Sequence, residues 1–140
     1  MGCVKFDLAL IGIAPLKDHH RSKASMTMKN FYGLLGGRRN VFHQDINTII
    51  AELAMMVKPT LVVLDGTEVM ISNGPTGGST SDLKRCDTVI ASCDMVAADA
   101  YGCSLLGLSP DDLPYLTKAQ AAGAGVMDYQ SLKPIIENAG

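Results

Sequence analysis

The feature that most constrains this chain is an amphipathic segment lying between two apolar runs. Across residues 46–57, isoleucine, leucine, alanine and valine recur at the spacing of one face of a helix. Asp45 fits the N-cap of that helix, and Pro59 ends it. A helix that connects two neighbouring strands is a crossover, which makes the strands parallel and the connection right-handed. The pattern therefore predicts an α/β fold.

Three apolar runs are predicted to be strands. Residues 6–13 form the first, closed by Pro15, and residues 60–64 and 88–92 form the second and third. Near-continuous aliphatic runs are typical of strands covered on both faces. We therefore expect a three-layer α/β fold, with a mostly parallel open sheet and helices on both faces. The tail, residues 132–137, is expected to add an edge strand.

Helices are expected after the third strand. Asp94 can cap a helix over residues 95–106, in which Asp99 is a lone carboxylate among mostly apolar residues. Asp99 must face solvent, find a partner or belong to a site, because burying an unpaired charge is costly. A further helix is expected to run from Pro110 to about residue 122 and to end at Gly123.

Length and charge limit the classes of protein that this chain can be. Its 140 residues fit one domain, residues 1–140, and its net charge of −2 argues against nucleic acid and anionic membranes as partners. No apolar stretch reaches 18 residues and no secretory signal begins the chain, so we expect a cytoplasmic protein. The first strand starts within a few residues of Met1, which suggests the C-terminal part of a longer domain.

Cysteine spacing argues against an iron–sulfur cluster in this chain. The four cysteines show no C-x-x-C spacing and lie on or beside predicted core elements, which favours buried thiols in a reducing compartment; they are Cys3, Cys86, Cys93 and Cys103. Metal binding is also disfavoured, although His19, His20 and His43 with Asp65 would supply enough ligands. Adjacent histidines point in different directions, and no helical H-x-x-x-H spacing occurs.

Two loops carry groups that suit an oxyanion. Residues 36–40 read G-G-R-R-N and present the guanidinium groups of Arg38 and Arg39 on a flexible turn. Residues 73–81 read N-G-P-T-G-G-S-T-S, where glycines allow close backbone approach and hydroxyl groups can donate to an anion. Neither the G-x-x-x-x-G-K-[ST] motif nor a G-x-G-x-x-G motif is present, which argues against ATP or NAD binding by those mechanisms.

Five motifs occur in a particular order across nearly the whole chain. They are P-L-K-D-H-H at 15–20, M-K-N-F-Y-G at 28–33, P-T-L-V-V-L-D-G at 59–66, N-G-P-T-G-G at 73–78 and A-S-C-D-M-V-A-A-D-A at 91–100. In these the chain resembles the uncharacterised domain of unknown function family 362, some members of which are fused to ferredoxin-like iron–sulfur domains. The family's usual segment before the first strand and its ferredoxin cysteine clusters are absent here.

The matched polar residues define the candidate site. If the sheet is parallel, Lys17, His20 and Asp65 leave the carboxyl ends of strands and can converge as an acid–base or anion-binding set. They are the catalytic candidates, although a structural ion-pair network would have the same makeup. The ligand-binding candidates are Lys29, Asn30, Arg38, Arg39, Asn73, Gly74, Gly77 and Gly78. We expect Asp65 to share a crevice with Lys17, His20 or Lys29, and residues 73–78 to fold over it.

Two functions remain open from the sequence. One is an enzyme or enzyme domain that binds a small anionic ligand or cofactor at the ends of its strands, and the resemblance implies a redox link. The other is a non-catalytic binding or assembly module, completed by a missing segment or another subunit, because an unpaired strand edge recruits a partner. The candidate protein partners are a second copy of the chain, which this edge argument favours, and a ferredoxin-type protein, which the resemblance implies.

Overall fold

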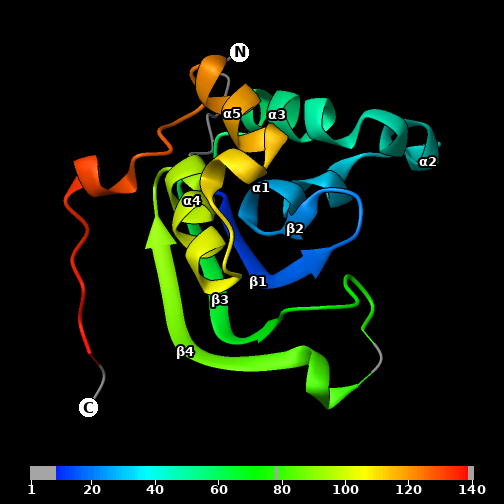
Figure 1. Ribbon diagram of the computed structural model, residues 1–140. Helices are drawn as coiled ribbons and strands as arrows, with labels where there is room; N and C mark the ends of the chain where they lie inside the picture. Colours follow the sequence, from blue (N-terminus) through cyan, green and yellow to red (C-terminus); the bar gives the residue numbers. More distant parts are fainter. Residues whose placement is uncertain (1–8, 78, 139–140) are drawn as a thin grey trace.

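The computed structural model describes residues 9–77 and 79–138, leaving aside the side chains of residues 39 and 40, and shows a four-stranded sheet (Figure 1). The order of the strands is β2-β1-β3-β4. The strands are β1 (Ile11–His19), β2 (Lys23–Ser25), β3 (Leu61–Met70) and β4 (Leu83–Ser92). β1 pairs with β3 in parallel, whereas β1–β2 and β3–β4 are antiparallel. The fold is α/β, as expected.

The expectation of a mostly parallel sheet is wrong, because the described sheet is mixed. The predicted crossover helix exists as α3 (Ile46–Met56) and precedes β3, which lies parallel to β1. β2 and β4, however, each follow their neighbour through a connection that does not cross the sheet. Such returning connections produce antiparallel pairs.

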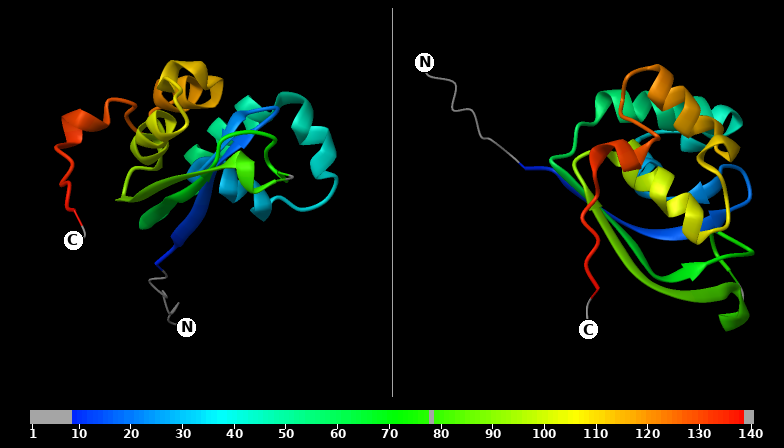
Figure 2. Two further views of the ribbon diagram at one scale, coloured as in Figure 1. Left: turned by 60° about the horizontal axis from the view of Figure 1, so that its bottom comes forward. Right: turned by 60° about the vertical axis from the view of Figure 1, so that its left-hand side comes forward.

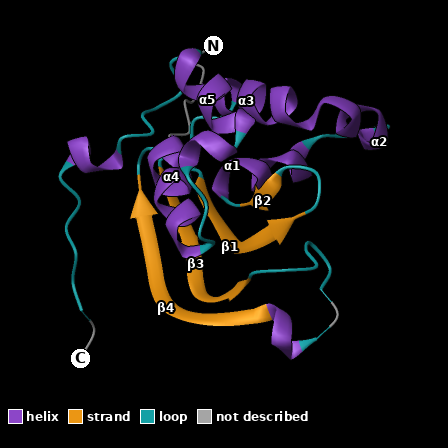
Figure 3. Ribbon diagram, viewed as in Figure 1, coloured by secondary structure: helices purple, strands orange, loops and turns teal. Residues whose placement is uncertain are grey.

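The helices gather on one side of the sheet (Figures 2 and 3). The α-helices besides α3 are α1 (Thr27–Asn30), α2 (Arg39–Phe42), α4 (Met95–Leu105) and α5 (Pro114–Ala121). Short 3-10 helices are η1 (Phe31–Leu34), η2 (His43–Asp45), η3 (Thr80–Asp82), η4 (Pro110–Asp112) and η5 (Tyr129–Leu132). α1 and α4 contact the strands, and α3 packs against α5.

Helices on both faces are not found in the described part of the chain, which corrects the three-layer expectation. Strand residues alternate between faces, and the inner set, which includes Leu16, Val62 and Leu64, is buried. On the outer face Ile11 is 54% exposed and Ile13 66% exposed. The apolar runs thus have a composition typical of strands that are buried on both faces, whereas the described helices cover only one face of the sheet.

The core lies between this inner face and the helices α1, α3, α4 and α5. A Cβ atom on Gly102 would lie 2.7 Å from both Leu64 Cδ2 and Met26 Sδ, so glycine allows α4 to approach the sheet closely. Asp94 caps α4 as predicted, accepting hydrogen bonds from the N–H groups of Val96 and Ala97 at 2.8 and 3.0 Å. Burial of the apolar side chains of α4 against the sheet stabilises the packing of the helices on the sheet.

All three predicted strands run further than expected, and β4 begins at Leu83 rather than at residue 88. β1 continues through Pro15 to His19, because β2 pairs only with residues 17–19 and one side of β1 is open at Pro15. β3 continues through Asp65 to Met70, with a register shift after Gly66. The predicted start of the first strand, residues 6–8, lies outside the described residues.

At the C-terminus, residues 132–137 form no strand in the structure, and lie apart from β4 as an extended tail (Figure 1). The expected helix after Pro110 is divided into η4 and α5, and ends before Gly123, which has a φ of +81°. Among the described cysteines, Cys103 is buried as expected, but Cys93 is exposed. Within residues 9–77 and 79–138, no helix is long and apolar enough to span a membrane.

Candidate functional site

Cationic and imidazole side chains converge where β1 ends. We call Lys17, His19, His20, Lys29 and His43 the cationic cluster. The His19 and His20 rings stack with centroids 4.9 Å apart, and His19 is 3% exposed. Burial lowers the pKa of His19 to about 4, and the nearby side chains of Lys29, His20 and His43 add to the effect. His19 is therefore neutral at pH 7.

The neutral His19 ring also shapes the turn that follows β1. Its Nδ1 accepts hydrogen bonds from the backbone N–H groups of Arg21 and Ser22, at 3.2 and 3.3 Å. A protonated ring could not accept these bonds, because both of its nitrogens would then be donors. The same ring thus orders the β1–β2 turn and forms one wall of the cationic cluster.

Lys29 projects from α1 into this cluster. Its side chain is half-buried, and Nζ lies 5.9 Å from the centroid of the Tyr32 ring. Burial lowers the pKa of Lys29, and the charge of Lys17 lowers it further. In the described part of the chain, the ion pairs join Lys23 to Asp112 and Arg85 to Asp87, so no carboxylate compensates Lys17 or Lys29.

A buried carboxylate from another helix fixes the start of α1. Asp99, on α4, is 0% exposed and accepts hydrogen bonds from Thr27 N–H at 2.9 Å, Thr27 Oγ1–H at 2.6 Å and Met28 N–H at 3.1 Å. Burial raises the pKa of Asp99 to about 7, against the opposing effect of these donors. The sequence left three possibilities for Asp99: exposure to solvent, a hydrogen-bonding partner or membership of a site. The structure shows that Asp99 has hydrogen-bonding partners, Thr27 and Met28.

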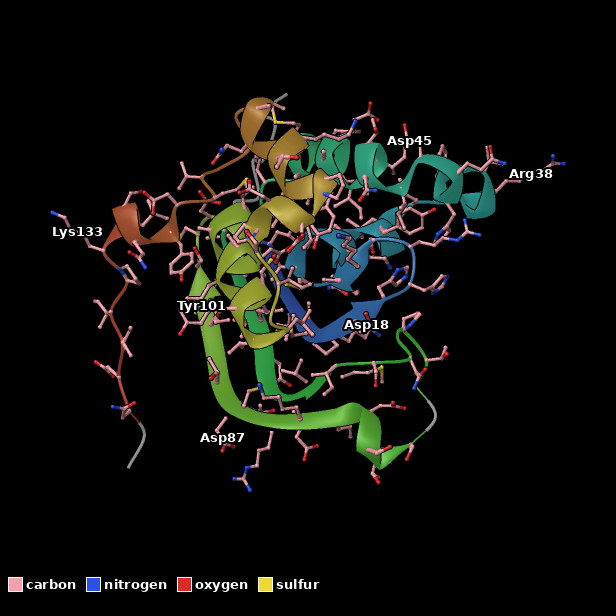
Figure 4. All side chains as sticks on the ribbon, viewed as in Figure 1. Asp18, Arg38, Asp45, Asp87, Tyr101 and Lys133 are labelled. Atoms are coloured by element: carbon pink, nitrogen blue, oxygen red, sulfur yellow. The ribbon has the colours of Figure 1, made fainter. Side chains whose placement is uncertain are left out.

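We call residues 73–77 and 79–81 the glycine-rich loop. It folds against the end of β1, where the carboxylate of Asp18 accepts a hydrogen bond from it (Asp18 is labelled in Figure 4). Gly74 N–H donates to Asp18 Oδ2 at 3.0 Å, and the carbonyl of Gly74 lies 3.4 Å from His20 Nδ1. A Cβ atom on Gly74 would overlap the backbone carbonyl of Asp18, so only glycine fits there. The Gly74–Pro75 peptide bond is cis. At Gly74, therefore, the loop meets the cationic cluster.

Asp82 organises the interior of this loop and was missed by sequence reasoning. Its buried carboxylate accepts hydrogen bonds from Ser72 Oγ–H at 2.6 Å, Asn73 Nδ2–H at 2.7 Å and Ser79 N–H at 3.1 Å. The S-x-x-D spacing from Ser79 to Asp82 is that of a capping box, which was the available signal. Asp18, the other loop anchor, was visible only as one member of a charged stretch.

Several predicted ligand-binding residues have structural partners. The Asn30 amide donates to the carbonyl of Ile13 at 3.0 Å, and the Asn73 amide is bound to Asp82. Gly77 N–H donates to the carbonyl of Asn73 at 2.8 Å, and Gly77 has a φ of +63°. Arg38 is exposed on the distal turn before α2 (Figure 4). Gly78 and the Arg39 side chain lie outside the described part of the structure.

Asp65 has a different position from the one expected. It lies within β3 rather than at the end of the strand, and its register partners are Pro15 and Val89. Its carboxylate accepts hydrogen bonds from Thr67 N–H at 2.9 Å and Thr67 Oγ1–H at 2.7 Å, which lower its pKa. None of the hydrogen bonds or ion pairs found among the described residues joins it to Lys17, His20 or Lys29. Its membership of their site stays a prediction.

No group of three or more His, Cys, Asp or Glu side chains in the described residues is arranged to hold a metal ion. A separate hollow of about 600 Å³ lies between β4, α4 and the C-terminal tail, bordered by Asp87, Tyr101 and Lys133 (Figure 4). Sequence reasoning did not identify this hollow, because the hollow depends on where the tail lies relative to β4 and α4, which no local sequence pattern shows.

Sequence comparisons match most of this chain to a known family. A family described as "Domain of unknown function (DUF362)" matches residues 5–104. The thylakoid-associated protein sll1697 of Synechocystis is 27% identical over 122 residues, which cover 81% of this chain and 37% of that protein. The chain thus spans little more than a third of the length of this relative. No solved structure matches.

Proposed function

This chain belongs to the DUF362 family, and we propose that its role in that family is to bind a small anionic ligand or cofactor at the cationic cluster beside the end of β1. The family description assigns no activity, so the proposal rests on the site itself. Its ligand-binding candidates there are Lys17, Lys29 and His20, together with the loop at Gly74.

The observation that carries the proposal is the pair of lysines. Lys17 and Lys29 come from β1 and α1 and lie close enough for one charge to lower the pKa of the other. Like charges held together are destabilising unless a counter-charge joins them. In the described residues no carboxylate forms an ion pair with either lysine. A bound carboxylate or phosphate would relieve this repulsion.

The surroundings of the two lysines suit a small ligand. Asp18, the acid that acts on His19, is already bonded to the N–H of Gly74 and does not form an ion pair with the lysines. His20 lies at the edge of the cluster against the glycine-rich loop. Partly buried cations without counter-ions bind anions more strongly than exposed ones, because screening by water and salt is weaker there.

Thermal-shift measurements with phosphate, oxalate and citrate test the proposal. An anion that binds the folded state stabilises it by about 2.7 kcal/mol at a hundred times its dissociation constant. We expect Lys17→Gln to abolish the stabilisation, and Lys84→Gln, an exposed β4 control, to retain it. Equal stabilisation of both variants, or none in the unaltered protein at low ionic strength, would contradict the proposal.

Catalysis at this site is a further proposal. Lys17 and His20 would act as acid–base or electrostatic groups towards the bound anion, and Asp65 would join them only if the outer face of β3 borders the ligand. The redox link expected from the family resemblance is supported by that resemblance alone. Anion binding does not depend on it.

A second candidate function, a binding or assembly module, is favoured by the bare face of the sheet. Ile11, Ile13 and Val89 are 54%, 66% and 61% exposed, and Ile13 neighbours Val63 across the β1–β3 pair. Sheets with two apolar faces are normally covered on both, so another subunit is the proposed cover. Light scattering of the unaltered protein and of Ile13→Lys tests this, because self-association that disappears in the variant supports it. A strict monomer at high concentration excludes the self-assembling form.

A further inference from the structure

The edge of the sheet at β4 has no partner strand in the described part of the chain. β4 lies last in the order β2-β1-β3-β4, and among the described strands it pairs only with β3. The hollow of about 600 Å³ lies against residues 87–92 of β4, and Ala97, Ala98 and Tyr101 of α4 also border it. An open strand edge of this kind accepts an extended segment as a further strand.

Residues 133–138 of the C-terminal tail form an extended segment on the other side of the same hollow. None of the backbone–backbone hydrogen bonds found among the described residues uses an atom of residues 134–138. Ile135 is 89% exposed and Ile136 is 73% exposed, although both border the hollow. The edge of β4 and the tail thus both present backbone groups that are free to pair with a strand.

The start of the tail is held away from β4 within its own chain. Tyr129 of η5 packs on Tyr101 of α4 with ring centroids 5.1 Å apart, which attaches η5 to that helix. Lys133 then has a φ of +53°, and the tail runs in the direction opposite to the last part of β4, with the hollow between them (Figures 1 and 2). The volume of this hollow is within the range of pockets that bind ligands in proteins.

We propose that the hollow receives the C-terminal tail of a second copy of this chain, and that two copies exchange tails across a two-fold axis. The incoming tail lies between β4 and the resident tail in each copy. The order across the dimer is then β4 of one copy, the tail of the other, the tail of the first and β4 of the other. One surface serves both copies, as a closed two-fold interface requires. This interface uses the edge of the sheet, so it goes beyond the assembly through the bare face.

The sequence of the tail is self-complementary in this arrangement. Two tails related by a two-fold axis perpendicular to the sheet run antiparallel, and pairing centred on Ile135 places this residue opposite its own copy. The same register brings Lys133 of each tail to Glu137 of the other. Opposite charges that face each other across an antiparallel pair are stabilising. Pro134 is the first residue of the new strand, a position where proline is tolerated.

Light scattering of the whole chain over a range of concentrations tests the proposal, with charge reversal as the specific probe. We expect the unaltered protein to dimerise. Lys133→Glu or Glu137→Lys alone should weaken the dimer severalfold, because each change replaces two attractive pairs with two repulsive ones. The double variant, which exchanges the two charges, should restore dimerisation. Lys58→Glu, at an exposed lysine after α3, is the control and should leave dimerisation unchanged.

Hydrogen exchange at residues 87–92 reports on the edge of β4 itself. We expect the amide protons of this segment to become more protected as the protein concentration rises, because the incoming tail covers them. Ile135→Asp should abolish both the protection and the dimer, since two carboxylates would meet at the centre of the paired tails. Val41→Asp, which changes an aliphatic residue that is 56% exposed on α2, should abolish neither.

Four results would overturn the inference. A strict monomer at every concentration would exclude the dimer, and a charge-exchanged variant as weak as the single variants would exclude the pairing of the tails. Protection at residues 87–92 that does not depend on concentration would show that the tail closes on its own β4. Association that is lost in Ile13→Lys but retained in Ile135→Asp would place the contact on the bare face. In that case the assembly function stands and the exchange of tails fails, whereas the opposite pattern supports the exchange.

Discussion

Replacing Asp99 with alanine should detach the start of α1 from α4 and destabilise the protein strongly. Three donors would lose their acceptor: Thr27 N–H, Thr27 Oγ1–H and Met28 N–H. A buried donor without a partner costs about 1–3 kcal/mol. Removing a carboxyl group whose own burial is unfavourable offsets part of this loss, so we expect a net decrease of about 3 kcal/mol in the unfolding free energy.

Urea denaturation and thermal melting would measure this change. For a chain of this size, about 3 kcal/mol corresponds to a fall of about 6–12 °C in melting temperature. Asp111→Ala is the matched control, because Asp111 is exposed in the short helix η4. Asp99→Asn should be intermediate, since its carbonyl oxygen can serve Thr27 while its amide nitrogen faces the Met28 N–H. A loss below about 1 kcal/mol for Asp99→Ala would refute the reasoning.

The pH dependence of stability gives an independent check. The pKa of Asp99 is raised from 3.8 to about 7 in the folded state, so between these values the native state binds more protons than the unfolded state. The contribution of Asp99 is fully present below pH 3.8 and is lost as pH rises through 7. The stability of the unaltered protein relative to Asp99→Asn should therefore fall between pH 4 and 8 and level off above that range. A flat difference would contradict burial as the dominant cause.

Three further changes have definite expected outcomes. His19→Asn keeps an acceptor for the turn but removes the imidazole, whose pKa is lowered from 6.5 to about 4. The unaltered protein should lose on the order of 3 kcal/mol of stability as pH falls from 6.5 to 4, and this loss should be absent from pH-dependent melts of the variant. Gly74→Ala should release the loop from Asp18 and accelerate amide hydrogen exchange at residues 73–77 with little effect on α3. Asp94→Ala removes the α4 N-cap and should lower the urea-unfolding free energy by about 1 kcal/mol; no change would show that Val96 N–H finds another acceptor.

Patterns local to the sequence predicted much of the fold. The period of the apolar residues identified α3, and the Asp94 cap identified the start of α4, because each depends on side chains a few positions apart. The covering of the sheet could not be predicted in the same way. Ile11 and Ile13 are residue types typical of buried strands whether or not a helix covers them, so only the structure shows that none of the described helices covers their face.

The candidate site was predicted in part for the same reason. Lys17 and His20 follow an apolar run that the sequence identifies; in the structure Lys17 lies inside the longer β1, paired with Ser25, and His20, just past the strand, contacts Gly74. Asp65 was placed at a strand end because glycine follows it, yet β3 passes through that glycine with a shift of register. Contacts between distant segments, such as Asp18 with the glycine-rich loop, depend on tertiary packing and leave no local pattern.

The one-sided sheet has a consequence for how substitutions would be tolerated along its strands. Successive residues of β1, such as Ile13 and Ala14, belong to opposite faces, so a saturation-mutagenesis map of the isolated chain should show alternating permissive and restrictive positions. Selection for folding alone would act on the inner positions. A second map, measured by selection inside the cell, would lose this alternation if the outer positions were also restrictive there. The positions that differ between the two maps would then identify the residues of that face that contact a partner.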